Sequence, residues 1–421
     1  MSTAVEFYQA QAQSVLSSIP WLLQMQTKAL ALLTHSGFPS RHDEDWKYTQ
    51  LDGLLQHNYT KALASTKTVA SDLPFPMQVS VYNGSIQIIE ESTSQLPKAV
   101  LILPLAQAMV DHPDLVKPYL GKVLQVQHGF HCLNTAMIQL GVFIYIPEGV
   151  QIDTPLVISH YQDQNETAVH LRHLIIAEKG SQSSVIEEYR GQEQSTYFTD
   201  TITEVHVGEK ARITHFKIQR EAKSACHLGH IAVKQCAHSE FASHSISLGG
   251  KLVRSDISID LQQEYAQCLM NGIYIPTEGQ HVDHHTTVHH LVPNCRSAQD
   301  YKGILKGRAR AVFNGKVIVA KNAQHSDASQ QNKNLVLSSN AEIDTKPQLE
   351  IFADDVLCSH GATVGQLDEE ALFYLATRGI DRAEASQYLI QAFAEDNIRL
   401  IPQPQLAAWL GHLITQQVGC V

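Results

Sequence analysis

Residues 175–185 have the sequence IIAEKGSQSSV, and a similar pattern returns at 203–213 (TEVHVGEKARI), 231–241 (IAVKQCAHSEF) and 259–269 (IDLQQEYAQCL). The starting positions are evenly spaced, and every segment ends on an apolar residue, the last being Leu269. The first and third residues of every segment are apolar or β-branched, and positions two apart on a strand lie on the same face. An apolar strand face therefore recurs at a fixed interval.

A fixed period of this length is typical of repeat proteins in which each coil packs on its neighbours. The repeated unit has two strands and two turns with no helix, so the pattern predicts a parallel β-helix. An antiparallel β-sandwich is the alternative, because it also has short strands at intervals of about 8–12 residues. The period blurs after Ile275, and the later coils are inferred rather than counted. No convincing helix is expected between about 125 and 365.

The regions on either side of the repeats have a different pattern. Apolar residues at helical spacing between Val5 and Leu33 predict N-terminal helices, which Gly37 ends. The stretch 79–103 looks extended, with Asn83-Gly84 as a candidate hairpin turn. We therefore expect an N-terminal helical and mixed domain at 1–124, followed by a β-helix core at 125–366.

The last part of the chain, 367–421, is expected to form a C-terminal helical domain. Its helices are predicted from the segments LDEEALFYLATRG, IDRAEASQYLIQAFAEDN and QLAAWLGHLITQQ. These helices have more apolar surface than they can bury among themselves, so they must pack on the β-domain, on the N-terminal helices or on a partner. The apolar stripe of the second helix is predicted at Ala385, Tyr388, Leu389, Ala392 and Phe393.

Composition narrows the class of protein. The net charge of −11 argues against nucleic-acid binding, which needs a basic surface to neutralise phosphates. No segment has the ~18–20 continuous apolar residues of a membrane span, and the N-terminus lacks the pattern of a secretory signal. The seven cysteines are odd in number, scattered and never in a C-x-x-C pair, which favours a reducing compartment. We expect a cytoplasmic protein.

The stretch HVDHHTTVHH at 281–290 has the highest density of potential metal ligands. On a strand, His281, Asp283, His285, Thr287 and His289 would face one side, and the residues between them would face the other. Same-face neighbours on one strand are ~6.5–7 Å apart, too far to chelate one metal ion without further ligands. We therefore favour a structural role, in which these side chains bond the backbone of adjoining coils. A metal site at His285 and His289 is the alternative.

A shorter motif, CSH at 358–360, is the better candidate for chemistry. Cys358 and His360 are two positions apart in an extended segment, so both should project from the same face. Thiolate and imidazole are ligands that suit iron–sulfur clusters and other soft metals. Two ligands make half a site, so the others must come from another coil or another chain. The G-x-x-x-x-G-K-[ST], H-E-x-x-H and G-x-S-x-G motifs do not occur.

Several long segments resemble the SufB/SufD family of iron–sulfur cluster assembly proteins. They are RHDEDWKYT (41–49), NCRSAQDYKGIL (294–305), GRARAVFNGKVIVAKNAQHSDASQQNKNLVLS (307–338) and AEIDTKPQLEIFADDVLCSHGATVGQLDEEALFYLATRGI (341–380). The resemblance covers most of the chain. The length of the chain and its helical N-terminal part are more similar to the SufD branch of the family than to the longer SufB branch.

The resemblance implies a right-handed β-helix between two helical domains, and a scaffold formed with SufB and two copies of the ATPase SufC. It implies that SufC docks on the C-terminal helices, around Leu372, Phe373, Leu389 and Phe393. It also implies that the end of the β-helix pairs with SufB, and that His360 acts there with a SufB cysteine in nascent cluster binding. Cys358 belongs to the same D-D-x-x-C-S-H-G motif and is the second candidate ligand.

The resemblance thus implies a non-enzymatic subunit that supports iron entry and cluster formation, with iron or a cluster bound transiently and nothing held tightly by the isolated chain. It also implies that a reduced flavin can join the complex. The isolated chain is expected to be able to form a homodimer through the end that would face SufB. The alternatives are a metal-dependent hydrolase using the 281–290 histidines, and an architectural protein in which Cys358 and His360 only pack.

Overall fold

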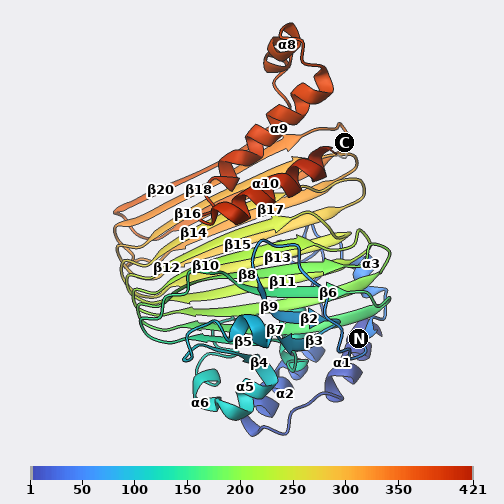
Figure 1. The fold of residues 1–421 in the computed structure, drawn as a ribbon. Coiled ribbons are helices and arrows are strands. Elements are labelled where there is room, and N and C mark those ends of the chain that lie inside the picture. The colour runs from blue at the N-terminus through green and yellow to red at the C-terminus, as the bar shows by residue number, and fades with distance from the viewer. Residues whose placement is uncertain (1–2, 420–421) are drawn as a thin grey trace.

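A parallel β-helix forms the centre of the computed structural model, which describes residues 3–419 (Figure 1). Each coil contributes one strand to each of two sheets. The first sheet contains β5 (Val142–Ile146), β7 (Thr167–Ala177), β9 (Tyr197–Val207), β11 (Cys226–Gln235), β13 (Leu252–Leu261), β15 (His281–His290), β17 (Arg310–Val319) and β19 (Glu342–Ile351). The second contains β6 (Leu156–Gln162), β8 (Gln182–Gly191), β10 (Arg212–Arg220), β12 (Glu240–Ser247), β14 (Gln267–Tyr274), β16 (Arg296–Leu305), β18 (Ser326–Val336) and β20 (Val356–Gly365). The predicted β-helix is confirmed.

The spacing between coils is less regular than the sequence suggests. In the first sheet Thr203 pairs with Ile231, as a constant interval requires, but Ile175 pairs with Val205 instead of Thr203. The displacement is by two positions, and an even shift keeps the same face inside. In the second sheet Phe241 pairs with Cys268, one position short of Leu269. Leu269 therefore lies on the outer face, and its assignment to the repeating apolar face is wrong.

The space between the sheets is filled by side chains from both. On one side of it, a continuous apolar cluster joins inward residues of the first sheet, such as Val205, Val233 and Ile259, to Ile213 and Phe241 of the second. Each of these side chains is at most 2% exposed. Burial of this cluster is the main favourable term for the coils, at about 1.5–3 kcal/mol for each large apolar side chain.

The N-terminal part begins the β-helix and covers its first end. The hairpin predicted at Asn83-Gly84 joins β2 (Met77–Tyr82) to β3 (Ser85–Ile88). Asn83 and Gly84 have φ angles of 48° and 82°, as a tight turn between twisted strands requires. β2 and β3 extend the second sheet, whereas β4 (Leu101–Pro104) extends the first and β1 (Thr60–Lys61) pairs with β7.

Helices pack beside these strands. They are α1 (Thr3–Gln13), α2 (Pro20–Ser36), the 3-10 turn η1 (Glu44–Trp46), α3 (Asp52–Leu55), α4 (Glu90–Thr93), α5 (Leu105–Asp111), α6 (Pro113–Val116) and α7 (Gly129–Ala136). The expectation of no helix after residue 125 is wrong for α7. Every residue of α7 is buried, between α2 and the β-helix. A short helix buried on every side has no amphipathic period to reveal it.

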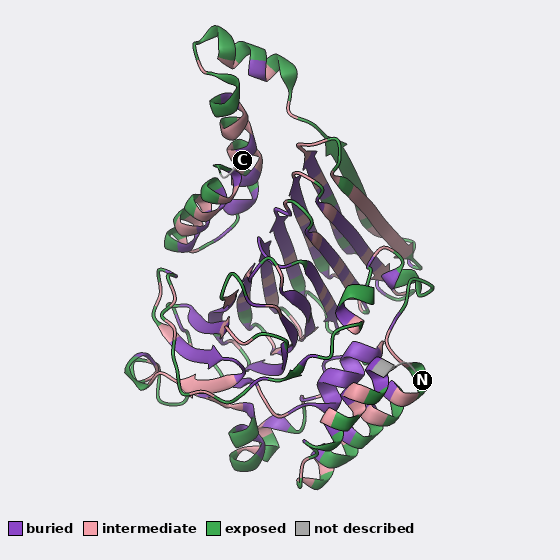
Figure 2. Ribbon diagram, turned by 90° about the vertical axis from the view of Figure 1, so that its right-hand side faces the viewer, coloured by how far each residue is buried: buried purple, intermediate pink, exposed green. Residues whose placement is uncertain are grey.

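The three C-terminal helices are confirmed as α8 (Glu369–Thr377), α9 (Arg382–Ile398) and α10 (Pro404–Gly419). The second half of α9 and all of α10 pack on the outer face of the second sheet (Figure 2). Leu406, Leu410 and Ile414 of α10 meet Phe216 and Ile246 in that interface. The predicted stripe on α9 is partly wrong, because its buried residues are Ala385, Ile390, Ala394, Asn397 and Ile398. α8 extends away from the sheets, and most of its surface is exposed.

Candidate functional site

Within the part of the chain that the structure describes, the β-helix ends in two strands that are each paired on one side only. β19 and β20 are the last strands of the first and second sheet, bonded to β17 and β18 respectively. Most of β20 is exposed, and β19 is mostly half-buried. Exposed apolar side chains surround this end, among them Phe352, Leu357 and Val364. An unpaired edge with apolar neighbours is a ready template for another chain.

β20 carries both predicted ligand residues. Cys358 pairs in register with Ala328 of β18, and His360 pairs with Gln330. Ala328 and Gln330 are each 1% exposed on the inner side of β18, so Cys358 and His360 also belong to the inner face. His360 is exposed, because no further coil covers it.

Cys358 is partly buried beside Ala328 and Leu349. This burial, and to a lesser degree the charge of Asp327, raises the pKa of the Cys358 thiol. The thiolate is the form that binds metal, so metal binding there would release a proton. Within residues 3–419 no group of three or more His, Cys, Asp or Glu side chains is arranged to hold a metal ion. On this chain alone the pair is half a site.

The histidine stretch forms β15, and its side chains alternate as predicted. Val282, His284, Thr286, Val288 and His290 are buried, whereas the odd-numbered histidines are half-buried on the outer face. Most of these side chains have partners on neighbouring coils. His284 lies 3.2 Å from the Ser247 hydroxyl, His290 lies 2.8 Å from that of Ser297, and His289 lies 2.8 Å from the Asp260 carboxylate. These partners are side chains, not the backbone that we expected.

Asp283 makes this strand an anchor for the N-terminal segment 41–49. Its carboxylate accepts hydrogen bonds from Thr49 and from Arg254, the latter at 3.2 Å, and lies 3.0 Å from His285. The guanidinium of Arg254 stacks over Trp46 with 3.8 Å to the ring centroid. Burial opposes ionisation of Asp283, but His285 and Arg254 outweigh it and hold its pKa below the usual value. This geometry favours the structural interpretation of the stretch.

The residues expected to dock an ATPase lie in two different environments. Leu372 of α8 is buried, whereas Phe373 is 72% exposed. Leu389 and Phe393 of α9 are half-buried, and Phe393 packs against the interface with the second sheet. The exposed aromatic side chains of these helices are Phe373 and Tyr374 on α8 and Tyr388 on α9. The sequence did not single out the two tyrosines for docking.

Sequence reasoning also missed Lys302, which ties α9 to β16. Its ammonium donates to the Phe393 carbonyl at 2.7 Å and to the Asp396 carboxylate at 2.9 Å. The Lys302 side chain is 1% exposed, whereas that of Asp396 is 66% exposed. A lysine is rarely buried, so nothing in the pattern of NCRSAQDYKGIL indicates that this one points into an interface.

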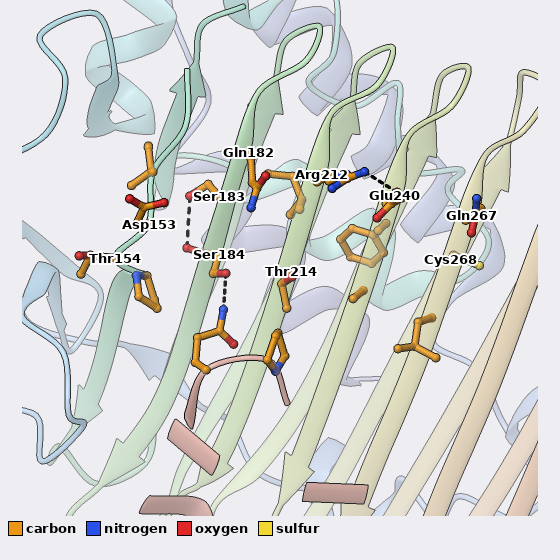
Figure 3. Close-up of a pocket in the computed structure, with 18 of the residues that line it drawn as sticks. Asp153, Thr154, Gln182, Ser183, Ser184, Arg212, Thr214, Glu240, Gln267 and Cys268 are labelled. Atoms are coloured by element: carbon orange, nitrogen blue, oxygen red, sulfur yellow. Dashed lines mark hydrogen bonds and ion pairs between the residues drawn. The ribbon is translucent and has the colours of Figure 1, made fainter. Parts of the chain in front are cut away.

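A groove lies on the outer face of the second sheet, whereas the cysteine–histidine pair belongs to the inner face (Figure 3). It has a volume of about 1280 Å³ and a floor of small side chains such as Ser184 and Thr214. Gln403, in the turn before α10, donates to the Ser184 hydroxyl at 2.6 Å. Arg212 and Glu240 pair across its rim at 3.2 Å. Among the described residues the groove offers no metal-ligand set, and the candidate chemistry stays at the end of the β-helix.

Comparison with known proteins covers nearly the whole chain. Residues 160–393 match the model of the SUF system FeS cluster assembly SufBD core domain, and residues 2–158 match that of the SufBD protein N-terminal region. An iron–sulfur cluster assembly SufBD family protein of Synechocystis is 31% identical over 95% of this chain and 91% of its own length. The iron–sulfur cluster assembly protein SufD of Escherichia coli is 31% identical over 87% and 86%.

SufD of Bacillus subtilis is 27% identical over 76% of this chain and 74% of its own length. None of the helices in the described residues combines the length and the apolar character that crossing a membrane requires.

Proposed function

The chain belongs to the SufBD family of iron–sulfur cluster assembly proteins, and from this premise we propose that it is a non-catalytic scaffold subunit. Its partner at the open end of the β-helix is a SufB-type chain. The cargo is iron and a nascent cluster, held transiently between the two chains. In the absence of the SufB-type chain, a second copy of this chain would cover the same end.

The half-site at the end of the β-helix carries this proposal. Cys358 and His360 lie on the inner face of β20, the last strand of the second sheet. In the described residues, the backbone edge of β20 that faces away from β18 has no partner strand. A second chain added to β19 and β20 would satisfy the unpaired backbone groups and bury Leu357, which is 75% exposed. It would also bring further ligands opposite the thiol and the imidazole.

An ATPase of the SufC type is proposed to dock on the C-terminal helices. The exposed aromatic side chains of Phe373, Tyr374 and Tyr388 support this location, because aromatic residues are enriched among those that dominate binding energy at protein interfaces. A displacement of α9 on ATP binding would act on β16 through the tie between Lys302 and Asp396. β16 lies two strands from β20 in the second sheet, so the displacement would reach the partner-facing end and open it for cargo.

The variant His360→Ala tests the proposed ligand role. We expect it to assemble with the SufB-type chain and the ATPase as the unmodified chain does, because the His360 side chain is exposed. We also expect cells carrying it to fail to mature iron–sulfur enzymes under iron limitation. Copurification measures the first outcome and growth with aconitase activity the second. His412→Ala, an exposed histidine on α10, is the control. Normal maturation with His360→Ala would refute the ligand role.

A further inference from the structure

A column of polar side chains leads through the interior of the β-helix to its open end. Gln299 of β16, Gln330 of β18 and His360 of β20 are consecutive partners in register. All three lie on the inner face of the second sheet. Paired strands are about 4.8 Å apart, so each side chain occupies the layer directly next to the following one. His360 is the last member of this column.

Gln330 is the unusual member of the column. Its side chain is 1% exposed, and neither its amide nitrogen nor its amide oxygen has a hydrogen-bond partner within residues 3–419. A buried polar group without a partner costs about 1–3 kcal/mol, so a group of this kind needs an explanation. An apolar side chain of the same size would avoid that cost.

The opposite sheet leaves room for this amide. Gly315 of β17 faces Gln330 across the interior, and a Cβ atom on residue 315 would lie 1.5 Å from the Gln330 Nε2 atom. The Gln330 side chain therefore crosses the interior, and its amide nitrogen lies against the backbone of β17. One layer further in, the Thr286 hydroxyl donates to the Gln299 Oε1 atom at 2.6 Å, and the Gln299 Nε2 atom has no partner among the described residues.

We propose that Gln330 positions the His360 imidazole when the partner chain closes the end of the β-helix. The Gln330 Oε1 atom accepts the ring N–H of His360 and so fixes the tautomer whose other nitrogen offers its lone pair to the cargo metal. Metal-binding histidines normally donate their second N–H to a carbonyl or carboxylate oxygen. In the free chain, solvent water accepts the hydrogen bond of this N–H. Closure removes that water, and Gln330, which lies in the next layer of the column, takes its place as the acceptor. This inference rests on the proposed function.

The test compares two substitutions that separate hydrogen bonding from packing. Gln330→Met keeps the size of the side chain and removes the acceptor, whereas Gln330→Glu keeps acceptor oxygens at the same place. Gln331→Met is the matched control, because Gln331 is the next residue of β18 and is exposed on the outer face. Each variant is purified as the complex with its SufB-type partner. Co²⁺ is titrated into the complex and followed by its visible absorption, with His360→Ala as the reference for loss of the ligand.

We expect Gln330→Met to weaken Co²⁺ binding by about 10–100-fold, the usual effect of removing the hydrogen-bond partner of a metal-binding histidine. Gln330→Glu should bind Co²⁺ within about threefold of the unmodified complex, because it keeps an acceptor oxygen. Gln331→Met should also bind Co²⁺ within about threefold, because it leaves the interior unchanged. If Gln330→Met binds normally while His360→Ala does not, Gln330 only fills space or holds a buried water, and the inference is wrong while the ligand role stands. If His360→Ala also binds normally, the proposed site itself is wrong.

Discussion

Replacing Asp283 with Asn should release the N-terminal segment 41–49 from the first sheet. Asp283 is fully buried and is the acceptor shared by Thr49 and Arg254. Arg254 has a side chain only 4% exposed, and it holds Trp46 through its ring contact. The substitution keeps the shape of the side chain but removes the negative charge that this arginine faces.

The expected cost follows from what Arg254 retains. Removing one partner of a fully buried ion pair costs about 3–5 kcal/mol, because a charge is left without compensation. Here Arg254 keeps the Asp256 carboxylate at 3.1 Å and the Asp45 carbonyl at 2.6 Å. We therefore expect about half of that cost, roughly 2 kcal/mol. If the segment opens locally, this corresponds to about 30-fold faster amide exchange in residues 41–49.

Hydrogen exchange followed by mass spectrometry measures this effect peptide by peptide. Asp260→Asn is the matched control, since Asp260 also pairs with a histidine of β15 at 2.8 Å, through His289, but lies outside the contacts that hold the N-terminal segment. Exchange in 41–49 that stays within about threefold of the unmodified chain after Asp283→Asn would refute the anchor role.

The same anchor should depend on pH in a defined direction. The folded-state pKa of Asp283 lies below its ordinary value, which is about 3.9 in an unfolded chain. Its contribution to stability is therefore complete above about pH 4 and is lost as the pH falls through the folded-state value. The exchange difference between Asp283→Asn and the unmodified chain should shrink in that acidic range.

Three further outcomes follow from the contacts described above. Lys302→Met should speed amide exchange in the second half of α9 by about tenfold or more, because it removes a charged hydrogen bond worth about 1.5–3 kcal/mol. Lys333 is the register neighbour of Lys302 on β18, and the control Lys333→Met should leave this exchange largely unchanged. Phe373→Ser should reduce recovery of the ATPase in copurification while thermal unfolding of the chain stays the same, because Phe373 is exposed. Replacing His285 and His289 together with Gln should leave the zinc and iron content of the purified chain unchanged by elemental analysis, since each already pairs with an aspartate; loss of stoichiometric metal would instead support the hydrolase alternative.

The repeating part of the fold could be predicted because strand periodicity tolerates irregular coils. The pairing of Ile175 with Val205 is two positions out of step with a constant period, yet an even shift keeps the same side chains inside. Leu269 shows where this tolerance ends, since a shift by a single position moves it to the other face. On α9 the sequence offers two apolar sides, and only contact with the second sheet decides that Ile390 and Ala394 are the buried ones.

The candidate site could be predicted only in part, because some of its residues are identified only by contacts between distant parts of the chain. Cys358 and His360 stand out through residue type and spacing, and the family resemblance directs attention to them. Gln330 and Lys302 become notable only once the register and the interfaces are known. Gln330 is a full coil away from its neighbour His360 along the chain, and Lys302 binds a helix 94 residues away. A single sequence contains no signal that relates such distant positions.

The one-sided pairing of the last coil has an energetic meaning. In a stack where each coil is stabilised by its nearest neighbours, an internal coil has two such interfaces and a terminal coil has one. The coil that carries Cys358 and His360 is therefore the first to fray. A free subunit keeps its two proposed ligands on its least stable coil, and a partner that adds the missing interface would stabilise both residues at once. If Cys358 and His360 hold iron as proposed, capture of iron would be thermodynamically linked to assembly, and an unassembled subunit would have little capacity to hold it.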